Sequence, residues 1–163
     1  MWWSDRRTVI LGLLALAGCG FTPVYGPGSA ASTLRDQVQI TAPATVEGYA
    51  MLQALRDRLG NTTTPALALT VTLAITEVAA ATTTEGSTTR YTLPGTASYT
   101  LTRLDGTPLV AGAVDGFTSY SATGTTVATS TARADARARL AQLLADQIVT
   151  RLSVADLSPP LTP

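Results

Sequence analysis

A segment of strict alternation limits the fold of this chain more than any other part of its sequence. Within Ala66–Val78, a large apolar residue occupies every second position from Leu67 to Ile75, and alanine or threonine lies between. The large residues are Leu67, Leu69, Val71, Leu73 and Ile75. Because successive side chains of a strand point to opposite faces of a sheet, the pattern predicts a half-buried strand. One face must meet helices from elsewhere in the chain, and the other is small enough for something else to lie against it.

Three other segments have the character of strands. Arg35–Ala42 alternates apolar and polar residues, and Leu109–Ser121 contains glycines that obscure its phase. Thr88–Arg103 keeps its apolar residues in phase, but Pro94-Gly95 interrupts it and predicts a bulge or an edge position. The polar segment Thr82–Ser87 predicts a hairpin connection. The in-phase residues of the longest strand are Tyr91, Leu93, Ala97, Tyr99 and Leu101.

Two amphipathic segments predict helices. Val46–Leu59 has apolar residues at three- and four-residue spacing, with Thr45 as its N-cap and Gly60-Asn61 at its end. A longer helix is expected over roughly Val127–Ser153. The expected core positions are Tyr49, Leu52, Leu55 and Leu59 in the first helix and Leu140, Leu143, Leu144, Ile148 and Leu152 in the second. The sequence therefore predicts an α+β fold, with two helices packed on one face of a four-stranded sheet in the order β-α-β-β-β-α.

The N-terminus has the pattern of an exported lipoprotein. Arg6 and Arg7 precede the apolar run Val9–Leu16, which is too short to span a hydrocarbon core of about 30 Å. The next residues, Leu16-Ala17-Gly18-Cys19, fit a bacterial lipobox, in which the cysteine sulfur accepts a diacylglycerol before cleavage. We therefore expect Cys19 to carry a lipid anchor. A buried structural cysteine is the alternative, and the arginine pair leaves both the general secretory and the twin-arginine export routes open.

The chain divides into four parts by composition. Residues 1–18 form the expected lipoprotein signal peptide, and residues 19–34 form the lipidated N-terminus and a flexible tether rich in glycine, proline and small polar residues. The folded domain is expected over residues 35–154. Residues 155–163, which include three prolines, form a tail with no apolar pattern that would bury it.

The charged residues exclude several classes of function. The chain has 11 basic and 11 acidic residues, and removal of Arg6, Arg7 and Asp5 with the signal peptide leaves nine against ten. This balance provides no basic field that would hold nucleic acid. Histidine is absent and Cys19 is the only cysteine, which excludes the common His/Cys zinc sites and His-based catalytic triads. We therefore expect no metal, no cofactor and no enzymatic activity.

Three segments carry a resemblance to a known family. Gly18–Gly26 reads Gly-Cys-Gly-Phe-Thr-Pro-Val-Tyr-Gly, Tyr49–Leu59 covers the first expected helix, and Thr131–Leu152 covers most of the last. They resemble the LptE family of lipopolysaccharide-assembly lipoproteins, in its alphaproteobacterial form. The resemblance implies a lipid-anchored protein of the outer membrane, facing the periplasm, that plugs the lumen of the LptD β-barrel, supports its assembly and binds lipopolysaccharide. The alternative is a lipid-anchored auxiliary or binding subunit of another envelope transport system.

Two arginines on the expected strands are candidate lipopolysaccharide contacts. The resemblance implies that basic side chains meet the phosphates of the lipid, and Arg90 and Arg103 could do so because a guanidinium fork can bind phosphate oxygens through two hydrogen bonds. The alternative is that each is an ordinary solvated surface charge. Arg133, Arg137 and Arg139 flank the apolar stripe of the last helix, where we expect them to keep the helix soluble.

Overall fold

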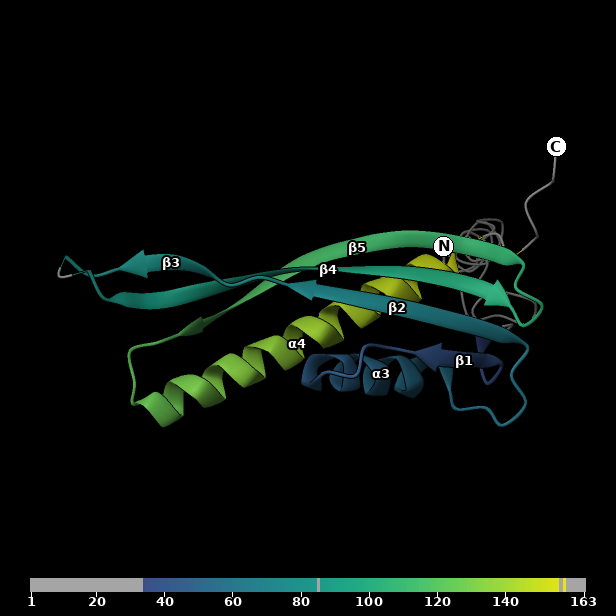
Figure 1. The fold of residues 1–163 in the computed structure, drawn as a ribbon, viewed down its shortest axis with the longest axis horizontal. Coiled ribbons are helices and arrows are strands. Elements are labelled where there is room, and N and C mark those ends of the chain that lie inside the picture. Colours follow the sequence, from purple (N-terminus) through teal and green to yellow (C-terminus); the bar gives the residue numbers. More distant parts are fainter. Residues whose placement is uncertain (1–33, 85, 156, 158–163) are drawn as a thin grey trace, which may run out of the picture.

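The sheet and two helices lie within the part of the chain that the computed structural model describes, namely residues 34–84, 86–155 and 157. Helix α3 follows the first strand, and helix α4 ends the domain (Figure 1). In chain order the elements are β1 (Val38–Thr41), α3 (Val46–Leu59), β2 (Leu67–Ile75), β3 (Val78–Thr82), β4 (Thr88–Arg103), β5 (Pro108–Ser121) and α4 (Thr126–Ser153). The predicted α+β class and the order of its elements are confirmed, with one strand more than expected.

Strand β4 is the centre of the sheet. It pairs antiparallel with β2 and β3 on one side and with β5 on the other, while β1 pairs parallel with β2. The in-phase residues of β4 face the helices, and all of them are buried except Tyr91, which is partly buried. Helix α4 reaches the centre of this face, because Leu140 packs directly over Gly95. A Cβ at position 95 would lie 2.8 Å from a Leu140 methyl group, so any larger residue there would displace this buried side chain.

The predicted strand Ala66–Val78 is divided into β2 and β3. Both halves keep one register against β4, because Ile75 lies opposite Gly95 and Val78 lies opposite Thr92. The division falls opposite Pro94, which accepts a hydrogen bond from the Thr76 N–H through its carbonyl (3.0 Å) but has no N–H to return. The prediction that Pro94-Gly95 marks a bulge or an edge was therefore wrong: the proline lies in the central strand, and its missing donor interrupts the neighbouring strand.

The buried face of each helix differs slightly from the face that its sequence predicts. Tyr49 is 65% exposed, whereas Met51 is fully buried. The two residues are about 200° apart around the helix axis, so they lie on opposite sides of α3. In α4, Leu143 is 37% exposed, while Ala141 and Ala145 are buried. The core therefore selects small residues beside Leu140, Leu144, Ile148 and Leu152, because α4 packs closely against the sheet.

The ends of α3 follow the sequence closely. The Thr45 hydroxyl accepts a hydrogen bond from the Gly48 N–H (3.1 Å), which satisfies one of the N–H groups that a helix leaves without an internal partner. Gly60 ends the helix with a φ of 84°, a conformation that favours glycine. The predicted cap, helix and terminating glycine are thus all confirmed.

The core extends slightly beyond the expected limits of the domain. Leu34, which the sequence places at the end of the tether, is fully buried, and Leu157 packs against the core from the segment expected to be a tail. The expected signal peptide, almost all of the tether and Cys19 lie outside the described residues. Within those residues, no helix is long and apolar enough to cross a membrane.

Candidate interaction surfaces

The sheet face that points away from the helices is small and almost uncharged. Even-numbered residues of β2 and β4 point to this face, as do the odd-numbered residues of β5 that pair with them. Its exposed residues include Thr70, Thr72, Ala74, Pro94, Thr96, Ser98, Ala113, Asp115 and Phe117. We call this surface the outer sheet face. Its β2 part agrees with the small, polar face expected from the alternating segment, and Asp115 is the only charged residue among those named.

An aromatic side chain interrupts this polar surface. Phe117 is 70% exposed and lies opposite Pro94 on the adjacent strand. Val78, on β3, is 52% exposed and lies opposite Thr92, two residues from Pro94. Large aromatic side chains contribute much of the binding energy at protein interfaces when hydroxyls and small residues surround them. The exposure of Phe117 could not be predicted from the sequence, because the glycines of β5 obscure which of its residues share a face.

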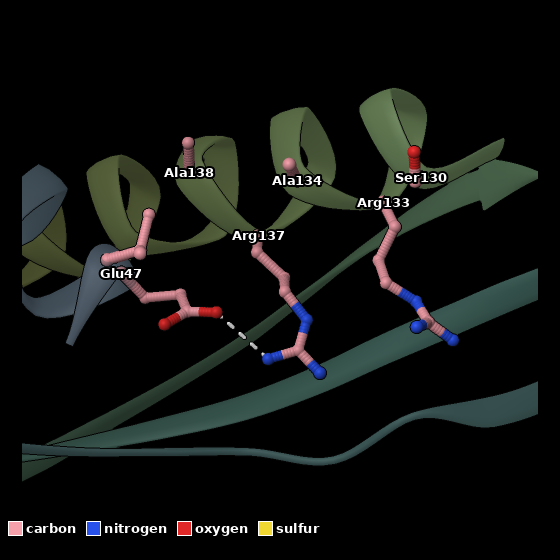
Figure 2. Close-up of a pocket in the computed structure, with 7 residues that line it drawn as sticks. Glu47, Ser130, Arg133, Ala134, Arg137 and Ala138 are labelled. Atoms are coloured by element: carbon pink, nitrogen blue, oxygen red, sulfur yellow. Dashed lines mark hydrogen bonds and ion pairs between the residues drawn. The ribbon is translucent and has the colours of Figure 1, made fainter. Parts of the chain in front are cut away.

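A cluster of alternating charges joins the helices to the sheet. Arg137 Nη1 donates to Glu47 Oε1 at 2.9 Å, and Arg133 forms an ion pair with Glu77 in the link between β2 and β3. Arg137 Nη2 also lies 3.9 Å from Glu77 Oε2. Figure 2 shows Arg133 and Arg137 extending from the same side of α4 toward the strands, with Glu47 opposite Arg137. The cluster therefore ties α3, the β2–β3 link and α4 together.

The charges of this cluster compensate one another. The pKa of Glu47 is held below its ordinary value, first by a hydrogen bond from its own backbone N–H and then by the guanidinium of Arg137. The pKa of Arg133 is raised by its hydrogen bond to the Tyr120 hydroxyl (3.1 Å) and by Glu77. A pocket of about 280 Å³ beside the cluster is lined by Val46, Glu47, Ser130, Arg133, Ala134, Arg137 and Ala138. With each arginine paired to a glutamate, the pocket has little net charge to attract an anion.

The structure does not bring the two candidate lipopolysaccharide contacts together. Arg90 and Arg103 are both exposed and lie near opposite ends of β4. Thirteen residues at about 3.3 Å each separate them by about 43 Å, and their odd spacing directs them to opposite faces of the strand. A single phosphate therefore cannot contact both. By contrast, the structure pairs Arg133 and Arg137, expected only to solubilise α4, with glutamates 56 and 90 residues away in sequence.

The described residues define a small α+β domain, with one helix-covered sheet face and one open face that carries little charge. Across residues 34–84, 86–155 and 157, no group of three His, Cys, Asp or Glu side chains could hold a metal ion.

The chain belongs to the LptE family. The family model described as lipopolysaccharide assembly matches residues 35–152, which is most of the chain and nearly all of its folded part. This protein is accordingly a member of a lipopolysaccharide-assembly family. The resemblance of its helical segments to this family is thereby confirmed, whereas the segment Gly18–Gly26 lies outside the matched residues. No curated protein sequence matches the chain.

Solved structures share the fold at low sequence identity. A protein from Caulobacter crescentus described as a lipoprotein is 21% identical, with a TM-score of 0.62 over 76% of this chain and 92% of that one. Rare lipoprotein B from Shewanella oneidensis is 15% identical, with a TM-score of 0.57 over 72% and 93%. Lipoprotein B from Nitrosomonas europaea is 12% identical, with a TM-score of 0.55 over 73% and 83%. These likenesses establish the fold alone.

Proposed function

We propose that this protein is an outer-membrane lipoprotein that plugs an LptD-like β-barrel, supports its assembly and assists lipopolysaccharide transport to the cell surface. It acts without catalysis, as a binding partner. The observation that carries the proposal is the family match over residues 35–152, which spans the helices and every strand. The outer sheet face supports it, because a plug must lie closely against another protein.

The chemistry of the outer sheet face suits a closely fitting protein partner. Threonine and serine hydroxyls can form hydrogen bonds with backbone groups of a partner, so their removal from water costs little free energy. Removing water from a charged surface would cost more free energy, and the charged exceptions here are Asp115 and, near one end of β4, Arg90. Phe117 and the adjacent Pro94 provide an apolar contact near the middle of the paired strands. We assign this face to the wall or loops of the barrel.

The lipid anchor supplies the second element of the proposal. Cys19 would carry the acyl chains, and the tether would connect it to the domain that begins near Leu34. One acyl chain gives only marginal membrane binding, whereas two or more give stable attachment, at about 0.8 kcal/mol for each buried CH₂ group. The domain would thus remain at the membrane without a spanning helix.

Arg90 and Arg103 are proposed as two separate contacts for lipopolysaccharide phosphates. Within the described residues neither forms an ion pair, whereas Arg58, Arg133, Arg137 and Arg139 all do. An unpaired guanidinium keeps both edges of its fork for a phosphate. The variants Arg90→Asp and Arg103→Asp, measured separately and together against purified lipopolysaccharide, should each weaken binding. Unchanged binding by the double variant would remove both residues from the proposal.

The function is tested by purifying the lipidated protein from native membranes. We expect a large outer-membrane β-barrel to copurify in fixed ratio, and depletion of the protein to leave that barrel misassembled. Copurification with an inner-membrane complex would instead favour an auxiliary subunit of another transport system. Normal folding and amount of the barrel after depletion would refute the proposed role in assembly.

A further inference from the structure

One edge of the sheet is covered along only part of its length. Strand β1 pairs with β2 over Leu67–Thr70 and ends at Thr41. Figure 1 shows β1 beside one end of β2, with β3 continuing the same edge beyond the other end. No described strand lies beside the stretch from Leu73 to Ala79, which we call the open edge. The sheet is four strands wide where β1 is present and three strands wide at β3.

The hydrogen bonds fix which backbone groups point outward. The Thr76 N–H donates to the Pro94 carbonyl at 3.0 Å, so Thr76 faces β4. Because this direction alternates along a strand, Leu73 and Ile75 direct their N–H and C=O groups away from β4. The Leu67 N–H, in the same phase, donates toward β1 at the Gln37 carbonyl (3.0 Å). Register is kept across the β2–β3 link, so Ala79 also points outward.

The side chains along the open edge suit an added strand. Leu73 and Ile75 lie on the helix side and are only partly buried, so a further strand would cover apolar surface there. All five residues of β3 are exposed, and none is charged. Proteins commonly protect such edges with lysine, proline or inward-pointing charges. The one charged residue here, Glu77, is instead paired with Arg133 on α4.

The opposite edge of the sheet, formed by β5, is less suitable for pairing with an added strand. Strand β5 carries the charged Asp115 on its exposed side, and its register shifts where it passes Leu101 and Thr102 of β4. Bulges and charges are both devices that discourage strand pairing. The register of β3 also shifts, but only beyond Ala79.

We propose that the open edge binds one extended segment of the β-barrel partner, which completes the row that β1 begins. This inference rests on the proposed function. A closed barrel has no unpaired strand in its wall, so the segment must come from a loop or from a part of the partner outside the barrel. Six residue steps at about 3.3 Å give an edge of about 20 Å. The added strand would place apolar side chains beside Leu73 and Ile75 and small polar ones beside Thr72 and Ala74.

Residue-resolved hydrogen exchange tests this pairing directly. The full-length lipidated protein is measured alone and in the complex copurified from membranes. Alone, Ala74 and Thr76 should exchange slowly because their N–H groups face β4, while Leu73, Ile75 and Ala79 exchange rapidly. In the complex, the three rapid amides should slow at least tenfold. Their unchanged exchange in an intact complex would overturn strand addition and leave the proposed function standing, whereas failure to find any complex would overturn both.

A matched pair of proline variants gives an independent test. Ala79→Pro removes one outward N–H from the open edge. Thr126→Pro places the same residue at the first position of α4, where a proline ring is tolerated and the N–H has no partner within the helix. We expect Ala79→Pro to weaken retention of the barrel at least tenfold, and Thr126→Pro, which lies outside the open edge and the outer sheet face, to leave it unchanged. Equal retention by the two variants, each with a folded circular-dichroism spectrum, would refute the proposal.

Discussion

The side of α4 that packs against the sheet can be tested by truncating two of its leucines. Leu140 and Leu143 are three residues apart, and the sequence assigns both to one apolar stripe. In the structure Leu140 is fully buried above Gly95, whereas Leu143 is 37% exposed and reaches Gly116 with one methyl group. Truncation of each to alanine removes the same three carbon atoms. A difference in stability between the variants therefore measures how the helix is turned.

The expected magnitudes follow from burial. Leu140→Ala removes a fully buried side chain and leaves a cavity between α4 and the centre of β4, a change that typically costs 2–5 kcal/mol in the free energy of unfolding. We expect about 3 kcal/mol, because Gly95 has no side chain that could fill the space. Leu143→Ala removes a half-exposed side chain and should cost about 1 kcal/mol or less. The difference corresponds to roughly 10 °C in Tm for a domain of this size.

The assay is urea unfolding of the two variants and the parent chain, followed by circular dichroism. If the free energy of unfolding falls with urea concentration at the same slope in all three proteins while the transition midpoints differ, only stability has changed. Equal destabilisation by the two variants would show that α4 presents both leucines to the core, as the sequence pattern suggested. A larger effect of Leu143→Ala would refute the observed packing of α4 on the sheet.

Three further predictions concern capping, pH and the anchor. Thr45→Ala should lower the free energy of unfolding by about 1 kcal/mol, because the Gly48 N–H loses its acceptor, and an exposed Thr63→Ala control should change it little. Because the pKa of Glu47 is lowered in the folded protein, its carboxylate stabilises the fold above its ordinary pKa of 4.5, and this contribution is lost as pH falls through the lowered value. Glu47→Gln should therefore reduce the loss of unfolding free energy at acid pH. An unchanged acid side of the stability–pH curve would contradict this prediction. Cys19→Ser should abolish labelling with radioactive fatty acid, and continued labelling would exclude Cys19 as the acceptor.

Local chemistry let the sequence predict most of the secondary structure. The alternation from Leu67 to Ile75 fixed the buried and exposed faces of β2, and Thr45 and Gly60 fixed both ends of α3. These features depend on the side-chain period of a strand or on hydrogen bonds within a few residues, so a single segment contains the whole signal. The α+β class follows from the same information, because two amphipathic helices must bury their apolar faces on the sheet.

Only the tertiary structure decided how these elements affect one another. The break between β2 and β3 follows from Pro94, which lies on β4 and has no N–H to donate to the neighbouring strand. Glu77 and Glu47 meet Arg133 and Arg137 across 56 and 90 residues of sequence, so no local pattern could distinguish these arginines from solvated ones. The separation of Arg90 from Arg103 and the open edge beyond β1 also depend on which strands become neighbours. The sequence determined the periodicity of each element, and the pairing of the strands determined which surfaces a partner can reach.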